Sequence, residues 1–361
     1  MKGQNRERGF SLIELMVGML IAIVSSIVVF QMFSVSERQK RTTTGAADAQ
    51  SNGATAFYMI DRDVKMAGWG LEQGLIGGCN SLFTYLDDGA SAGPVNDLFA
   101  SVTVKDGGAG QDSINIQYYD NPSNDNFKLA LTSLRSTMPQ SSSELNVNST
   151  YACDIGDLAI VSQGGNCTLM EITQVQPSSL KLQHNPGGTP TYNPPVPYQN
   201  ANGWPAYSTG ASMQCFSKLY RRTYDVQGTT LRLSQPDAAW VMQTYEVVPH
   251  IVGMQAQYGI ADAGSQQVNA WVDATGAWAS PLPVASIRRI KAVRLSLVAR
   301  SAEFEKPDTT GVCATTTPAM VAGWSSWATF DTAGFPADWQ CYRYKAFESV
   351  VPLRNIIWAN L

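Results

Sequence analysis

The feature that most constrains this chain is an apolar run close to its N-terminus. Residues 10–33 (FSLIELMVGMLIAIVSSIVVFQMF) follow a short basic start, MKGQNRERG, and contain one charged residue, Glu14. As an α-helix this run would be about 36 Å long, which is enough to cross a hydrocarbon layer of about 30 Å. We therefore expect residues 10–33 to form a membrane-spanning helix and the rest of the chain to fold outside the bilayer.

Glu14 is a candidate functional residue because it is a charge within an apolar helix. An ionised side chain at the centre of a membrane helix costs roughly 2.5–3.5 kcal/mol on insertion scales, so we expect it to have a partner. No basic residue lies within the run. Cleavage after Gly9 would create a free α-amine on Phe10, one helical turn from Glu14 and on the same face. The partner of Glu14 is then its own amine or that of a neighbouring copy.

This arrangement resembles the class III leader and N-terminus of type IV pilins and type II secretion pseudopilins. The resemblance lies in the basic start, the Gly9–Phe10 junction and the sequence FSLIEL. It implies that residues 1–9 are a prepilin leader, that a prepilin peptidase cleaves between Gly9 and Phe10, and that Phe10 is then N-methylated. It also implies that Glu14 helps to dock each subunit into a growing filament.

Two other interpretations of the N-terminus remain open. A Sec signal peptide also has a basic start, but its apolar core is about 7–15 residues long and its cleavage site follows that core. Residues 34–36 (SVS) offer such a small-residue site. An uncleaved signal anchor would need neither the Gly9–Phe10 junction nor Glu14. Either interpretation would remove the argument for a filament subunit.

Composition and cysteine usage place the remaining chain outside the cytoplasm. Only 15% of the 361 residues are charged and the net charge is −4, which does not indicate a basic surface for nucleic acid. The even number of cysteines, without a CxxC pair, favours disulfides over zinc. The six are Cys79, Cys153, Cys167, Cys215, Cys313 and Cys341. Fifteen pairings are possible; short local loops favour Cys153 with Cys167 and Cys313 with Cys341, which would leave Cys79 with Cys215.

Residues 34–68 are expected to continue the helix as an amphipathic segment. Apolar residues recur at spacings of three and four at Phe57, Ile60, Val64 and Ala67, which predicts packing against a sheet. Helix propensity drops at residues 42–45. The glycines at 68 and 70 are candidate helix terminators, and the acids and bases at 61–65 are expected to form an exposed charged face.

The chain from residue 69 to residue 361 is expected to form one disulfide-bonded, β-rich head with long loops. Alternating or β-branched apolar segments predict antiparallel strands at residues 114–118, 158–161, 169–173, 180–182, 219–224 and 231–233. Residues 185–207 are rich in Pro, Gly and Asn and predict a long ordered loop against the sheet. Residues 302–342 are expected to be an insertion between the last two strands, held by its own disulfide.

A second resemblance covers several segments of the head. DRDVKMAGWG (61–70), VVPHIVGMQAQYGI (247–260), IRRIKAVRLSLVARS (287–301) and YKAFESVVPLRNIIW (344–358) resemble minor pilins of the PilW type and, more distantly, J-type pseudopilins. The resemblance implies an α+β, type IV pilin-like fold in which a long N-terminal hydrophobic helix packs on a C-terminal antiparallel sheet.

The implied function is that of a minor pilin that primes or caps a type IV pilus and supports twitching motility, adhesion or DNA uptake. Its implied partners are other minor pilins, the major pilin, the prepilin peptidase, the inner-membrane assembly platform and, before assembly, membrane lipid. The implied location is a single pass of the inner membrane with a periplasmic head, followed by the pilus tip. Two alternatives are a type II secretion pseudopilin of the J type and a membrane-anchored extracytoplasmic enzyme or glycan-binding protein.

We expect no catalytic site, cofactor or metal site. The chain has no GxSxG, P-loop, GxGxxG or HExxH motif, and its two histidines, His184 and His250, lie far apart in the sequence. The acidic segments at 87–89 and 120–126 lack the spacing of a calcium-binding EF-hand loop, so we interpret them as solvated turns.

Overall fold

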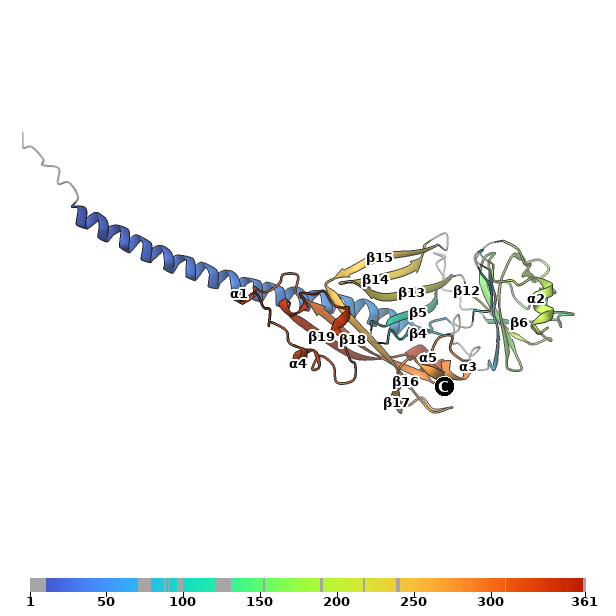
Figure 1. Ribbon diagram of the computed structural model, residues 1–361. Coiled ribbons are helices and arrows are strands. Elements are labelled where there is room, and N and C mark those ends of the chain that lie inside the picture. Colours follow the sequence, from blue (N-terminus) through green and yellow to red (C-terminus); the bar gives the residue numbers. More distant parts are fainter. Residues whose placement is uncertain are drawn as a thin grey trace, which may run out of the picture.

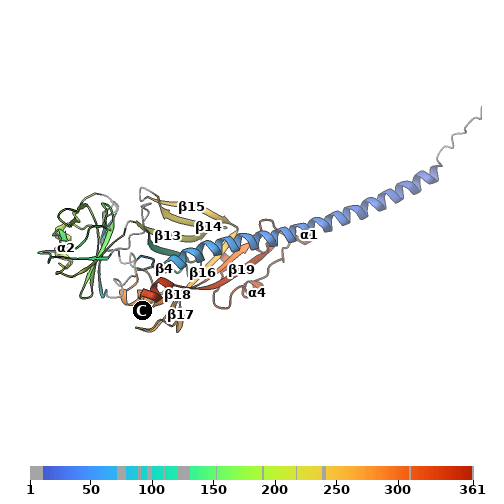
Figure 2. The same cartoon turned by 180° about the vertical axis from the view of Figure 1, so that it is seen from behind.

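The computed structural model shows a long helix that carries a β-rich head made of two lobes (Figure 1). The structure describes residues 11–70, 79–87, 89, 91–95, 100–108, 110–120, 131–151, 153–188, 191–216, 218–237, 241–308 and 310–359. Helix α1 (Leu12–Met66) is continuous over 55 residues and gently curved. Its first half extends away from the head and its second half lies along the head (Figures 1 and 2).

Small residues on one face let α1 lie close to the head. The buried positions Gly45, Ala49, Gly53 and Ala56 recur at intervals of three or four residues, and the larger Ile60 and Val64 continue the stripe. A Cβ added to Gly53 would lie 2.0 Å from a ring carbon of Phe347, so only glycine fits there. Residues 42–45, where propensity is low, remain helical because the head packs directly on this part of the helix.

The helix ends where the glycines predicted. Ala67 is the C-cap, and Gly68 and Gly70 have φ angles of 76° and 81°, a region that favours glycine. The backbone N–H of Gly68 donates to the carbonyl of Gln117 at 2.9 Å, which ties the end of α1 to the sheet.

The lobe that contacts α1, here called the helix lobe, contains two antiparallel sheets. The first has the strand order β15-β14-β13-β5-β4 and the second has the order β17-β16-β18-β19. The strands of the first sheet are β4 (Val102–Lys105), β5 (Ser113–Asp120), β13 (Lys218–Gln227), β14 (Thr230–Pro236) and β15 (Met242–Pro249). Those of the second are β16 (Ile251–Ile260), β17 (Ala270–Val272), β18 (Ile290–Arg300) and β19 (Tyr344–Pro352).

One hydrophobic core joins α1 to both sheets of the helix lobe. Ile60 and Val64 of the helix pack with Ile114 and Ile116 of β5 and with the inward residues of β16 and β18. Short helices complete this lobe: η3 (Gly276–Trp278), α3 (Val284–Ile287) and the C-terminal α5 (Arg354–Ala359). The expected fold, a long helix packed on an antiparallel sheet, is therefore confirmed in this lobe.

The second lobe, here called the distal lobe, lies beyond the C-terminal end of α1 (Figures 1 and 2). Its main sheet has the order β1-β9-β8-β12-β6, a smaller one has the order β10-β11-β7, and β2 pairs with β3. All pairs are antiparallel except β1 with β9. The elements are β1 (Ser81–Phe83), β2 (Leu86–Asp87), β3 (Ala92–Gly93), β6 (Leu131–Ser133), β7 (Leu145–Asn146), β8 (Leu158–Gln163), β9 (Asn166–Glu171), β10 (Gln174–Gln176), β11 (Lys181–Gln183), α2 (Val196–Ala201) and β12 (Ser212–Phe216).

The distal lobe has its own buried residues on both faces of its main sheet, separate from the core around α1. The described residues of the expected loop, 185–188 and 191–207, pack on this lobe, but they include the short helix α2, which was not expected. Asn193 and Tyr207 are buried. Asn193 Oδ1 accepts a hydrogen bond from the backbone N–H of Glu171, and Asn193 Nδ2 donates one to the carbonyl of Glu171. The single head expected from sequence is thus divided into two lobes.

Two of the three expected disulfide pairings are wrong. The structure pairs Cys79 with Cys167 and Cys153 with Cys215, and only Cys313–Cys341 agrees with the expectation. Side chains alternate between the two faces of a sheet. Cys167 on β9 lies on one face of the main distal sheet, and Cys153 packs on the other face with Cys215 of β12. Proximity in sequence therefore did not bring Cys153 and Cys167 together.

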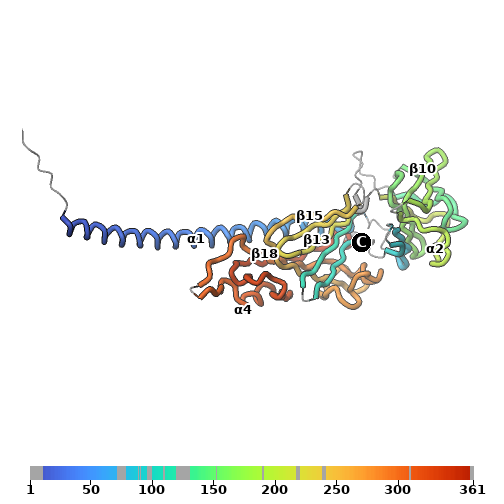
Figure 3. The backbone as a smooth tube through the Cα atoms, turned by 45° about the horizontal axis from the view of Figure 1, so that its top comes forward, coloured from blue at the N-terminus to red at the C-terminus, as the bar shows by residue number. Residues whose placement is uncertain are grey.

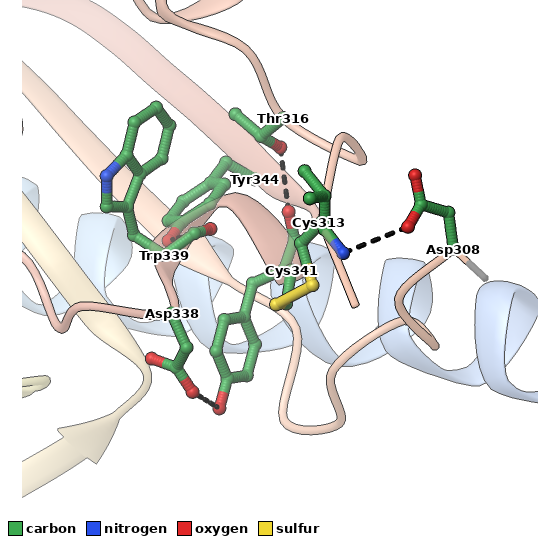
Figure 4. Close-up of a disulfide and its surroundings, with 9 residues drawn as sticks. Asp308, Cys313, Thr316, Asp338, Trp339, Cys341 and Tyr344 are labelled. Carbon is green, nitrogen blue, oxygen red and sulfur yellow. Dashed lines mark hydrogen bonds between the residues drawn. A yellow bond between two sulfur atoms is a disulfide. The ribbon is translucent and has the colours of Figure 1, made fainter. Parts of the chain in front are cut away.

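The insertion at 302–342 covers the second sheet of the helix lobe on the side away from α1. It contains α4 (Pro318–Val321), η4 (Thr332–Gly334) and η5 (Trp339–Cys341). Trp324, Phe330 and Phe335 pack on Val252 and Val298 of the sheet. The Cys313–Cys341 bridge lies at its edge, near Tyr344 and Trp339 (Figure 4).

Candidate functional site

The first half of α1 is an apolar surface with no covering within the chain. The large apolar side chains from Leu12 to Val35 are each between 49% and 79% exposed. Within the part of the chain that the structure describes, α1 is the one helix long and apolar enough to cross a membrane. Such a continuous exposed surface is stable only against lipid or against other apolar helices.

Glu14 lies in the first turn of α1 and caps the helix. Its Oε2 accepts a hydrogen bond from the backbone N–H of Ser11 at 3.0 Å, while Ser11 Oγ accepts one from Ile13 N at 3.4 Å. This reciprocal arrangement is a capping box. The carboxylate thus has one partner within its own helix and keeps further lone pairs for a second donor. Gly9 and Phe10, the predicted processing residues, lie outside the described residues.

The other end of α1 is held by the buried charge of Asp63. Asp63 was expected on an exposed charged face, but it is 1% exposed. Its two carboxylate oxygens each lie 2.9 Å from Nη1 of Arg222 on β13, and Tyr224 donates its hydroxyl to Oδ2 at 2.5 Å. Arg62 adds a partly exposed ion pair at 3.1 Å.

The residues around Asp63 form a small network between α1 and the first sheet. Burial, and then the hydrogen bond to Asp63, raise the pKa of Tyr224 far above its usual range, so its hydroxyl remains a donor. Successive side chains of a strand point to opposite faces, so Arg222 and Tyr224, which are two residues apart on β13, both lie on the face that meets the helix. This alternation was the one sequence signal that could have indicated a partner for Asp63.

A second buried carboxylate, Asp112, joins the two sheets of the helix lobe. Its Oδ1 accepts from Gly107 N at 2.9 Å, and its Oδ2 accepts from Ala256 N on β16 at 2.8 Å. Burial raises the pKa of Asp112 to about 6 despite these two hydrogen bonds, which act in the opposite direction. Asp112 has a structural role, since both of its carboxylate oxygens accept hydrogen bonds from backbone N–H groups.

The histidines do not form a site. His184 lies in the distal lobe, where its Nε2 is 2.9 Å from the carbonyl of Ser143, and burial lowers its pKa. His250 forms the corner between β15 and β16 with a φ of 63°. Among the described residues, no group of three His, Cys, Asp or Glu side chains is placed to hold a metal ion. Of the acidic turns, Asp87 accepts from Gly89 N at 3.0 Å, and residues 121–126 lie outside the described residues.

Comparison with known proteins gives two sequence matches. Residues 4–30 match the prokaryotic N-terminal methylation motif, and residues 206–355 match the family model described as Type IV Pilus-assembly protein W. The second match contains β13–β19, which form most of the helix lobe. It begins after the Cys79–Cys167 part of the distal lobe.

The comparison with solved structures includes a type IV-like pilin from Thermus thermophilus. It is 9% identical to this chain, with a TM-score of 0.34, and the alignment covers 85% of this chain and 96% of the pilin. No curated protein matches this chain. The similarity to known pilins therefore rests on the two sequence matches. With a methylation motif on the apolar N-terminus and a pilus-assembly family match over 150 of its 361 residues, this chain is similar to type IV pilins of the PilW type.

Proposed function

We propose that this chain is a minor pilin that primes or caps a type IV pilus together with other minor pilins. The observation that carries the proposal is the exposed apolar half of α1, which contains Glu14 as its one charge and projects from the head. In the membrane before assembly, lipid covers this surface. In a filament, neighbouring helices replace the lipid.

Processing would complete the N-terminal site. A prepilin peptidase would cleave between Gly9 and Phe10, remove residues 1–9 and methylate the new amine. Glu14 would then attract the Phe10 amine of a neighbouring subunit in a low-dielectric setting, where an unpaired charge is costly. A single ion pair at a fixed place on the helix would set the axial position of each subunit. The apolar segment at 10–33 and its continuation at 34–68 would act as one assembly element.

The shape of the head supports a place at the pilus tip. The distal lobe lies beyond the C-terminal end of α1, along the direction in which the helix points (Figures 1 and 2). In a filament of parallel helices, the head of the next subunit toward the tip would occupy that space. A subunit with such a lobe fits best where no subunit follows. Twitching motility, adhesion and DNA uptake would depend on this chain through the number of pili formed.

The family match over 206–355 supports a pilus over a type II secretion filament, whose subunits have the same kind of apolar N-terminal helix. The proposed partners are other minor pilins, the major pilin and the inner-membrane assembly platform. The head would lie in the periplasm before assembly. Purification of the filament-bound chain with its neighbours would identify the system. Other pilins would co-purify with it from a pilus, and pseudopilins would co-purify with it from a secretion filament.

The capping box allows the docking role of Glu14 to be separated from a structural one. Glu14→Gln removes the charge but keeps an oxygen that can accept from Ser11 N, because glutamine also forms capping boxes. We expect Glu14→Gln and Glu14→Ala to insert into the membrane normally and to reduce incorporation into pili to a similar, large extent, at least about tenfold if the ion pair contributes ~1.4 kcal/mol or more. Incorporation is measured by immunoblotting of sheared pili against the membrane fraction.

Two control variants complete this test. Ser11→Ala removes the other half of the capping box, and Glu37→Ala removes an exposed acid on the same helix beyond the apolar run. Both should assemble nearly as well as the wild type. Normal pili with Glu14→Gln, together with a defect in Glu14→Ala and Ser11→Ala, would show that capping and not docking is the function of this carboxylate.

A further inference from the structure

The loop between β18 and Cys313 lies beside α1 just past the end of the apolar run. Glu305 of this loop accepts a hydrogen bond through Oε1 from Thr42 Oγ1 of the helix at 3.0 Å. The same oxygen accepts from Arg343 Nε at 2.7 Å, and Glu305 N donates to the carbonyl of Cys341. In Figure 3 this orange segment is the part of the head that extends farthest along α1 toward the apolar half.

The loop has a fixed shape that does not depend on a partner. The Cys313–Cys341 bridge closes it, and Asp308 forms a turn by accepting from Val312 N at 2.9 Å and from Thr310 N at 2.8 Å (Figure 4). Thr316 Oγ1 donates to the carbonyl of Tyr342 at 2.7 Å and holds the other side. Side chains on this loop are therefore presented at a constant position relative to α1.

The outward side chains combine apolar and basic groups. Phe304 is 44% exposed and Val312 is 55% exposed, and Lys306 between them is exposed. On the adjacent turn of α1, Arg38 is also exposed and lies on the same face as Thr42, while Lys40 is exposed at the same height on another face of the helix. Over the described residues, none of these three cations takes part in an ion pair, whereas Glu37 pairs with Arg41 and Glu305 with Arg343. Besides Glu37 and Glu305, the acids nearby are the exposed Glu303 and the turn-forming Asp308.

The height of these groups above the bilayer follows from the helix. Val35, two residues past the apolar run, is the last large exposed apolar residue before Thr42, which lies seven residues further, about 10 Å along the axis. The polar headgroup region is about 5–8 Å thick on each side of the hydrocarbon core. A loop fixed at Thr42 thus places its side chains at the outer edge of the headgroups. Long basic side chains can reach the phosphates from there.

We propose that the juxtamembrane surface formed by Arg38, Lys40, Phe304, Lys306 and Val312 rests on the anionic phosphate headgroups of the membrane that holds α1 before assembly. Exposed aromatic and aliphatic groups beside lysine and arginine are the chemistry that binds an anionic lipid surface. The contact fixes the height and tilt of the head above the bilayer, and it breaks when the subunit is extracted into a filament. This inference rests on the proposed function, because it requires residues 10–33 to lie in a bilayer.

Photo-cross-linking of the full-length chain tests this contact. The chain is placed in lipid nanodiscs of phosphatidylethanolamine and phosphatidylglycerol, with benzoyl-phenylalanine at one position at a time, and lipid adducts are measured by mass spectrometry. We expect the adduct yield at position 304 to exceed that at position 320 at least about fivefold, since only the juxtamembrane surface meets lipid headgroups. Met320 is a matched control because it is 53% exposed on α4 of the same insertion.

A charge variant and a membrane control separate the possible outcomes. Lys306→Glu should reduce the adduct yield at position 304 by about half or more, and Lys105→Glu on the exposed end of β4 should not change it. Equal yields at 304 and 320, or a cross-link from 304 to a second protein chain, would overturn the lipid contact. Position 23 within the apolar run must give lipid adducts in every sample. If it gives none, the membrane span itself fails, and the proposed function fails with this inference.

Discussion

At the scale of single residues, two buried carboxylates join the parts of the helix lobe: Asp63 joins α1 to the first sheet, and Asp112 joins the two sheets. Asp63 is neutralised by Arg222 and bonded by Tyr224, and Asp112 is bonded by two backbone N–H groups. Isolated buried carboxylates would be strongly unfavourable, so each depends on its partners. Substitution of either residue therefore tests the description of the site directly.

The Asp63 network predicts a large loss of stability for one acid and almost none for its neighbour. Asp63→Ala would leave the partly buried Arg222 without its carboxylate, which should lower the free energy of unfolding by about 3 kcal/mol or more. Asp61→Ala removes only an exposed pair with Lys65 and should cost about 0.5 kcal/mol or less. Urea unfolding of the full chain in detergent micelles measures both. Equal effects of the two substitutions would contradict a buried role for Asp63.

The raised pKa of Asp112 predicts a pH dependence of defined sign. The folded chain binds this proton with a pKa of about 6, whereas an unfolded aspartate has a pKa of about 3.9. Between these values the folded state binds more protons, so the contribution of Asp112 to stability decreases as pH rises from about 4 to about 6. The full difference is about 3 kcal/mol at ~1.4 kcal/mol per pKa unit.

Comparison with Asp112→Asn isolates this contribution from other titrating groups. His184, for example, has a lowered pKa, so its contribution decreases in the opposite direction, as pH falls below its unfolded pKa. The free energy of unfolding of the wild type minus that of Asp112→Asn should become larger as pH is lowered from 6.5 to 4. A constant difference over this range would mean that Asp112 does not titrate as described.

At the scale of secondary-structure elements, local patterns predicted which segments form and left open what they pack against. Alternation predicted the segments of β5, β13 and β14 because half-buried strands have a period of two, whereas the short apolar run at 158–161 predicted β8, which is buried on both faces. The apolar stripe at residues 57–67 predicted the packed face of α1. Asp63 and the pairing of Cys167 depend on which distant strand lies opposite, and no local period carries that information.

The small-residue face of α1 predicts a position-specific effect of glycine substitution. Gly53→Ala would place a methyl group against the ring of Phe347 on β19, and such overpacking costs about 1–3 kcal/mol. The gain in helix propensity, about 1 kcal/mol, offsets only part of this. We therefore expect a lower urea midpoint for the head. Gly18→Ala is the matched control, since nothing lies within 4 Å of its added Cβ. An unchanged midpoint in Gly53→Ala would contradict the close contact.

At the scale of the whole molecule, the two lobes have different roles in the proposed function. The helix lobe contains most of the pilus-assembly family match and fixes α1, while the distal lobe extends past the end of the helix. The division could not be predicted from the sequence, because the chain enters the distal lobe at β1, returns to the helix lobe for β4 and β5, and enters the distal lobe again at β6. Because the chain enters the distal lobe twice, no single linker in the sequence marks the boundary between the two lobes.

The proposed function requires the apolar helix to be a processed assembly element and not an ordinary anchor. The most direct measurement is the intact mass and N-terminal peptide of the full chain isolated from its native membrane. We expect a chain that starts at Phe10 and carries one added methyl group on its amine. A chain that starts at Met1 or at Glu37 would contradict it, since the first is an uncleaved anchor and the second a secreted protein.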